Sequence, residues 1–112
     1  MKAEVILEDS ANKEIINVDN ISNKDDFYYI DCSNAKNHLM VLNDGIIINR
    51  IDIDHSTKVA LTSNPFIEVS TLEGTLNFST KVVEINKNFD IISIVYSVND
   101  EVRKITIRYL GE

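Results

Sequence analysis

The 112-residue sequence contains one cysteine, one proline, three glycines and no tryptophan. A single cysteine cannot form a disulfide within the chain, so the fold is expected to need no covalent cross-link and to suit a reducing compartment. We interpret Cys32, which follows the apolar residues Tyr28 and Ile30, as a small buried side chain and not a reactive thiol, because no cation stands near it in sequence. The scattered glycines exclude a glycine-rich phosphate-binding loop.

Long hydrophobic runs and clusters of positive charge are also missing. Apolar runs such as residues 45–48 are far shorter than the roughly 20 residues that a membrane-spanning helix needs, and Glu4 stands where a secretory signal would be apolar. The 11 Lys and Arg residues against 18 Asp and Glu residues give a net charge of −7, which disfavours binding to nucleic acid and to anionic membranes. We therefore expect a cytoplasmic protein that binds neither.

The abundant residues predict an all-β protein. Isoleucine, valine, threonine, tyrosine and phenylalanine fit a pleated surface, and apolar and polar residues alternate through most of the chain. Hydrophobic residues make up 44% of the sequence, and 112 residues suit one domain with one core. We predict a single domain over residues 1–112 with about nine or ten strands, at residues 2–8, 14–19, 27–32, 38–42, 46–53, 58–62, 66–72, 75–85, 89–98 and 102–110.

Turn residues separate these predicted strands. Asp44-Gly45 tolerates the positive φ angles of a type I′ hairpin turn, and Glu73-Gly74 indicates a second hairpin. Pro65 interrupts the chain because proline cannot donate a hydrogen bond to a strand ladder. The polar residues 20–26 predict a loop, with a helical turn starting at Ser22 as the alternative. Consecutive hairpins of this kind make an antiparallel meander.

The strand predicted at residues 75–85 changes its phase of alternation at Val82-Val83. A β-bulge inserts one residue, reverses the phase and bends the strand; alternatively, both valines are buried between two layers without a bulge. A meander of this length either stacks as two sheets or closes on itself. We predict a bulge that lets the strand curve round a small closed antiparallel barrel.

Several segments resemble a known bacterial family. They are residues 44–50, 69–76, 90–96 and 104–107, with the aromatic residues 27–30 before them and a Thr-x-x-Gly hairpin at Thr71–Gly74. In order and content they are similar to the YwiB-like family, whose function is unknown. The resemblance covers about residues 25 to 110 and implies a calycin-like, lipocalin-type β-barrel of about 8–10 strands.

Five residues are candidates for binding a ligand inside such a barrel. Arg50 shares its phase with Ile46 and Ile48, so all three side chains can point inward, and an inward arginine can pair with a carboxylate through two hydrogen bonds. An arginine at the rim that reaches water is the simpler alternative. Aromatic side chains can line the same interior, although they more often fill a core. The candidates are Arg50, Tyr29, Tyr96 and Tyr109, with Thr71 of the hairpin.

Two other groups could carry chemistry but lack partners. Asp52, Asp54 and His55 are ligand types that divalent metals accept, yet no second group at a suitable spacing completes a site, so a solvated turn is the simpler interpretation. His38 and Cys32 could meet if their strands pair, but no third residue would orient them. We therefore expect no metal, no cofactor and no enzyme activity.

The leading functional prediction is a non-catalytic binding protein for a small apolar or acidic molecule. An eight-stranded barrel can be just filled by its own side chains or can hold one small ligand, and the many isoleucine and phenylalanine residues favour a filled interior. The alternative function is therefore a filled barrel that acts through its surface, as a protein interaction module or a homodimer.

Overall fold

The computed structural model describes residues 1–19, 21 and 23–111 and contains strands but no helix within them. The strands are β1 (Lys2–Glu8), β2 (Lys13–Val18), β3 (Asp26–Ile30), β4 (Lys36–Leu42), β5 (Gly45–Ile51), β6 (His55–Leu61), β7 (Phe66–Thr71), β8 (Gly74–Phe78), β9 (Thr80–Lys87), β10 (Ile91–Val98) and β11 (Glu101–Gly111). The predicted all-β class is confirmed. The alternative of a helical turn starting at Ser22 lies outside the described residues. No helical segment capable of crossing a bilayer is found in the part of the chain that was searched.

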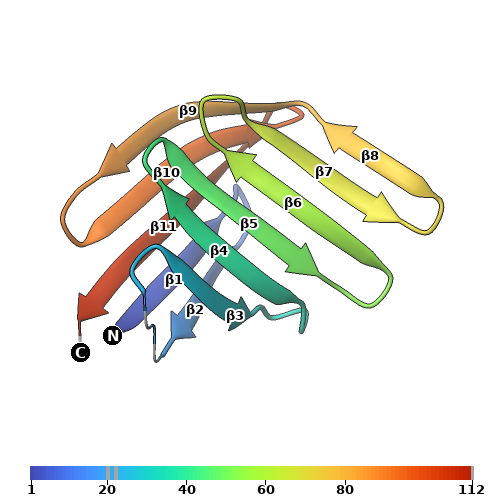
Figure 1. The fold of residues 1–112 in the computed structure, drawn as a ribbon. Helices are drawn as coiled ribbons and strands as arrows, with labels where there is room; N and C mark the ends of the chain where they lie inside the picture. The colour runs from blue at the N-terminus through green and yellow to red at the C-terminus, as the bar shows by residue number, and fades with distance from the viewer. Residues whose placement is uncertain (20, 22, 112) are drawn as a thin grey trace.

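The strands form two antiparallel sheets. The five-stranded sheet has the order β2-β1-β11-β10-β9, and the six-stranded sheet has the order β3-β4-β5-β6-β7-β8. Within each sheet, strands that follow one another in the chain pair with one another, and the first strand, β1, pairs with the last, β11. The predicted meander is therefore confirmed within each sheet. In Figure 1 the strands of one sheet pass across those of the other.

The predicted closure into one barrel does not occur in this structure. No ladder joins β2 to β3 or β8 to β9, so each sheet ends at two edge strands. The single strand predicted at residues 75–85 is divided at Ser79, because the backbone of Ser79 pairs outside the ladder: its carbonyl accepts the N–H of Asn99 at 2.9 Å, and its N–H bonds the Asn99 side chain at 3.3 Å. The chain crosses there from one sheet to the other, and this division brings the strands to eleven, above the range expected.

The predicted bulge at Val82-Val83 is confirmed. Glu84 pairs with Val95 and Val82 pairs with Tyr96, so Val83 is the extra residue between them. Val82 packs against the core, whereas Val83 is 65% exposed. The bulge lies on the edge strand β9, where such an irregularity protects a free edge from pairing with other chains.

The hydrophobic core lies between the two sheets. Alternate residues of several strands point into it, as in β10, where Ile92, Ile94, Tyr96 and Val98 are buried and the residues between them are only partly covered. Both sheets contribute to one cluster of buried side chains. The largest fully buried side chains are Leu39, Ile46, Leu61, Ile94, Ile107 and Val5.

Both predicted hairpins are present, but the type I′ turn predicted at Asp44-Gly45 is wrong, because the central residues Asn43 and Asp44 lack the positive φ angles that this type requires. The β4–β5 hairpin pairs Leu42 with Gly45 around a two-residue turn, and the β7–β8 hairpin pairs Thr71 with Gly74. Both glycines have positive φ angles, +153° at Gly45 and +138° at Gly74. These turns set the register of β5 and β8 and so decide which of their side chains face the other sheet.

Candidate ligand-binding cavity

A cavity of about 350 Å³ lies between the sheets. The six-stranded sheet contributes residues from β3 to β8, and the five-stranded sheet contributes residues from β1, β10 and β11. The lining residues are Leu7, Tyr29, Asp31, Asn37, Ile48, Arg50, Thr57, Val59, Ile67, Val69, Phe78, Tyr96, Val98, Arg103 and Ile105.

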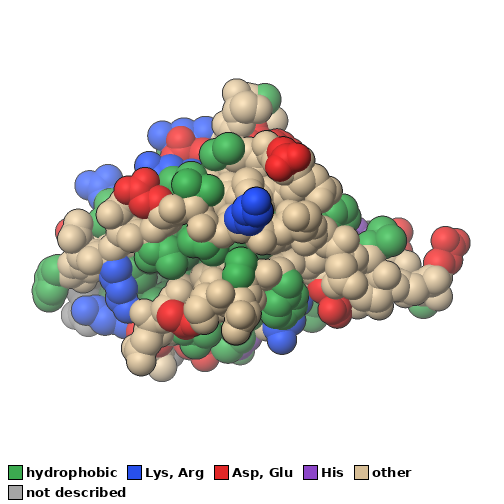
Figure 2. All heavy atoms as spheres, turned by 90° about the horizontal axis from the view of Figure 1, so that it is seen from above, with side chains coloured by type: hydrophobic (Ala, Val, Ile, Leu, Met, Phe, Trp, Pro, Cys, Tyr) green, Lys and Arg blue, Asp and Glu red, His purple; other side chains and the backbone are tan. Residues whose placement is uncertain are grey.

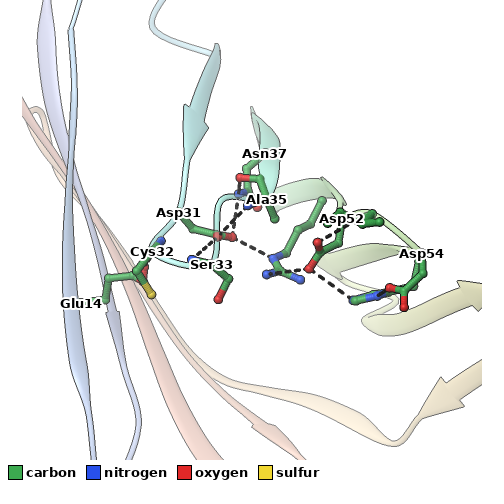
Figure 3. A network of polar contacts seen from close by, with 11 residues as sticks. Glu14, Asp31, Cys32, Ser33, Ala35, Asn37, Asp52 and Asp54 are labelled. Carbon is green, nitrogen blue, oxygen red and sulfur yellow. Dashed lines mark hydrogen bonds and ion pairs between the residues drawn. The ribbon is translucent and has the colours of Figure 1, made fainter.

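Asp31 holds the polar end of this cavity together. It follows β3, and one carboxylate oxygen accepts the backbone N–H groups of Ser33 and Ala35 at 3.0 and 3.1 Å. The other oxygen accepts Asn37 Nδ2 at 3.0 Å and Arg50 Nε at 2.8 Å. Burial alone would raise the pKa of Asp31, but these hydrogen bonds outweigh it and hold that pKa below its usual value. Figure 3 shows Asp31 among these partners.

The side chain of Arg50 lines the cavity and is 27% exposed. Its Nε donates to Asp31, and its Nη2 stands 3.6 Å from Asp52. Asp31 raises the pKa of Arg50, because a hydrogen-bonded carboxylate favours the charged guanidinium. The charge of Arg50 is therefore already balanced by the protein.

Tyr29 and Tyr96, both predicted as lining residues, face the same cavity from opposite sheets. Both are buried, and burial raises the pKa of each phenol, with Asp31 adding to the effect at Tyr29. The two hydroxyls thus stay protonated at neutral pH and can donate hydrogen bonds. Arg103 acts on the Tyr96 phenol and lowers its pKa in part, against the larger effect of burial.

Arg103 lines the cavity but was not among the predicted site residues. It stands on β11 directly opposite Tyr96 of β10. Its Nε is buried and is the one such side-chain atom in the described chain without a hydrogen-bond partner. The sequence does contain a signal for it: Arg103 shares its phase with Ile105 and Ile107, which is the same pattern that pointed to Arg50.

The other two candidates lie elsewhere. The hydroxyl of Thr71 donates to the Gly74 carbonyl at 3.1 Å and accepts the N–H of Glu73 at 3.2 Å, so this side chain stabilises the β7–β8 turn. The hydroxyl of Tyr109 donates to the backbone carbonyl of Lys24. Neither residue lines the cavity between the sheets.

The groups considered for metal binding or catalysis do not converge. His55 lies 2.9 Å from Asp54 and 3.9 Å from Asp52 on an exposed turn, and no group of three or more metal-ligating side chains was found within the described residues. His38 pairs with Asp26 and stacks on Tyr28, with ring centroids 4.3 Å apart, and does not meet Cys32.

Cys32 is exposed, which corrects the expectation of a buried side chain. It lies just beyond the end of β3, after the alternation that buries Phe27 and Tyr29 has stopped. Its backbone N–H donates to Glu14 at 3.2 Å, and Figure 3 shows the two residues side by side. The neighbouring Glu14 raises the pKa of the Cys32 thiol, which works against a reactive thiolate.

Comparison with known proteins finds a similar solved structure but no matching family model. No family model and no curated protein matches the chain. One solved structure that is similar is the crystal structure of ywiB protein from Bacillus subtilis, with 18% sequence identity, 99% of this chain and 89% of that chain covered, and a TM-score of 0.42. This likeness assigns neither a family nor an activity nor a ligand to this chain.

Proposed function

We propose that the protein is a non-catalytic binding protein that holds one small apolar or acidic molecule in the cavity between its sheets. The observation that carries this proposal is the cavity itself, about 350 Å³ in volume, lined mostly by apolar side chains and by a few polar ones. Pockets of this kind are the usual sites of small ligands. A dry cavity of ~150 Å³ can hold benzene, so this one suits a ligand of roughly a dozen non-hydrogen atoms.

Blocking the cavity tests this proposal. Val59 of β6 lines the cavity, and its neighbour Lys58 faces away from it. We expect native mass spectrometry of protein purified from its own host to show a bound small molecule, and Val59→Trp to lose it because the indole occupies the space. Lys58→Trp is the matched control and should retain the molecule. Retention by Val59→Trp, or no bound molecule and no binding of small apolar or acidic probes by the wild type, would contradict the proposal.

The proposal also includes a family, the YwiB-like proteins, and a location, the cytoplasm. The neighbour order, with β1 beside β11, is that of an up-and-down β-barrel opened at two places, which supports a YwiB-like member of the calycin-like folds. The exposed free thiol of Cys32 suits the reducing cytoplasm. The net charge of −7 favours neither nucleic acid nor membrane as a partner.

A second candidate function is a homodimer or protein interaction module that uses the free edge of β8. Its five residues, Gly74–Phe78, contain no charge, no proline and no bulge, so this edge lacks the usual protection against strand pairing. Leu76 is 59% exposed on β8, and Leu72 is exposed in the preceding turn. Figure 2 shows hydrophobic side chains exposed near the middle of the face seen from above, with a Lys or Arg side chain beside them.

Sedimentation velocity at micromolar concentration tests this second function. If β8 pairs with a second copy, we expect a dimer that Leu76→Lys converts to a monomer, because a charge on an edge strand opposes pairing. Ile15→Lys is the control, since Ile15 is an exposed apolar residue on β2 of the other sheet. A wild-type monomer that captures no partner would leave the β8 edge without this role.

A further inference from the structure

The cavity contains a buried hydrogen-bond donor that lacks an acceptor. This donor is Arg103 Nε, the one buried side-chain atom in the described chain without a partner. The side chains of Tyr29 and Tyr96 line the same space, and Tyr96 interacts with the Arg103 guanidinium. An unsatisfied buried donor is unfavourable by roughly 1–3 kcal/mol, so such a group points to a ligand that supplies the missing acceptor.

The residues that line the cavity include more positive than negative charges. Three charged residues line the cavity, and two of them, Asp31 and Arg50, form an ion pair at 2.8 Å. The carboxylate of Asp31 already accepts four hydrogen bonds. The third, Arg103, is left as the positive charge without a counterpart inside the cavity.

The pairing of Arg103 with the protein is weak. Its Nη2 donates to Glu101 at 3.2 Å, and the two side chains are 41% and 46% exposed. An exposed pair of this kind contributes little, about 0–1 kcal/mol. Asp9 in the β1–β2 turn also interacts with the charge of Arg103, and the N–H groups of Ala11 and Asn12 both bond its Oδ1.

We propose that the ligand is a carboxylate with one apolar group, and that Arg103 is the residue that binds its charged end. This inference rests on the proposed function and specifies the ligand of the same cavity. The Nε–H of Arg103 and the hydroxyls of Tyr96 and Tyr29 donate to the carboxylate oxygens, and the apolar part lies against Ile48, Val59 and Ile67. Arg50, whose charge is balanced by Asp31, positions the polar end and does not bind the anion.

The chemistry of the donors favours a carboxylate over a phosphate ester. A guanidinium matches the planar carboxylate and can form charge-assisted bonds to it. A phosphate monoester carries close to two charges at neutral pH and needs further cations, whereas the lining has one positive charge in excess. A single carboxylate therefore suits the unpartnered Nε–H of Arg103 better than a phosphate monoester does.

Two compounds of equal size test the inference by isothermal titration calorimetry at pH 7. The probe is 3-phenylpropionate, and its neutral counterpart is 3-phenylpropanamide. We expect the carboxylate to bind the wild type at least about tenfold more tightly, since a hydrogen bond to a charged group contributes more than a neutral one. Arg103→Met should remove this preference, and Arg103→Lys, which keeps the charge without Nε–H, should restore part of it.

Arg108→Met is the matched control, because Arg108 lies on the same strand, exposed and outside the cavity; it should keep the preference. Equal binding of the two compounds by the wild type would overturn the carboxylate inference and leave the cavity proposal standing. Binding of neither would count against both. A preference that survives Arg103→Met unchanged would overturn the role of Arg103. If Arg103→Met does not fold, the comparison of the two compounds on the wild type still tests the carboxylate inference.

Discussion

Gly45→Ala is expected to lower the free energy of unfolding by at least about 3 kcal/mol. A Cβ at this position would stand 1.8 Å from the carbonyl oxygen of Leu61 and 2.8 Å from its carbonyl carbon. These are backbone atoms of the adjacent strand, and Ile46 and Leu61 pair with each other immediately beside them. The clash therefore forces β5 and β6 apart at a point where both strands belong to the core. Urea denaturation followed by circular dichroism measures the loss.

Gly74→Ala is the matched control for this prediction. Gly74 has a similar φ angle, +138° against +153°, but no atom lies within 4 Å of the position of its Cβ. The alanine there meets only the unfavourable backbone conformation, which amounts to about 1 kcal/mol. The difference between the two variants isolates the contact with Leu61. Equal losses would show that β6 relaxes away from the added methyl group at little cost.

Asp31→Asn is expected to lower the free energy of unfolding by about 2–3 kcal/mol near neutral pH. The Asp31 side chain is 9% exposed. If the amide oxygen keeps the two backbone N–H groups, the amide nitrogen takes the place of the oxygen that faces Asn37 and Arg50. Donors would then face donors, and Arg50 would lose its main counter-charge. The expected value is below the full range for a buried ion pair because Arg50 reaches water in part.

The loss at Asp31 should depend on pH in a definite direction. Since the pKa of Asp31 is lowered in the folded protein, the carboxylate stabilises the fold above its unfolded pKa of about 3.9, and this contribution disappears as the pH falls through the folded value. The difference between wild type and Asp31→Asn should therefore be full at pH 6–7 and shrink below about pH 4. Asp54→Asn, on the exposed turn, is the control and should change stability by less than about 0.5 kcal/mol. A difference that stays constant with pH would contradict an ionised Asp31.

The sequence predicted those parts of the fold that depend on local patterns. The doubled Val82-Val83 changes the phase within one strand, and the bulge follows from neighbouring residues alone. Asp44-Gly45 likewise marks the position of the β4–β5 hairpin from neighbouring residues alone. The division at Ser79 could not be predicted in the same way, because it depends on hydrogen bonds to Asn99, 20 residues away. Whether the sheets close depends on such distant contacts.

The site was partly predictable for the same reason. Alternation shows which side of a strand a residue is on, and this placed Arg50, Tyr29 and Tyr96 toward the interior. It could not show that Asp31, which follows a strand, would turn back to bond Arg50, 19 residues further along. Tyr109 has the inward phase as well, but it lies near the end of β11, where its hydroxyl reaches Lys24 beyond the cavity.

The two places without a ladder have a consequence for how a molecule could reach the interior. Within the described residues no ladder joins β2 to β3 or β8 to β9. A path to the interior along these two borders would separate no pair of strands and leave the pairing inside each sheet intact. Uptake and release would then require no unfolding of either layer, only a widening at its border.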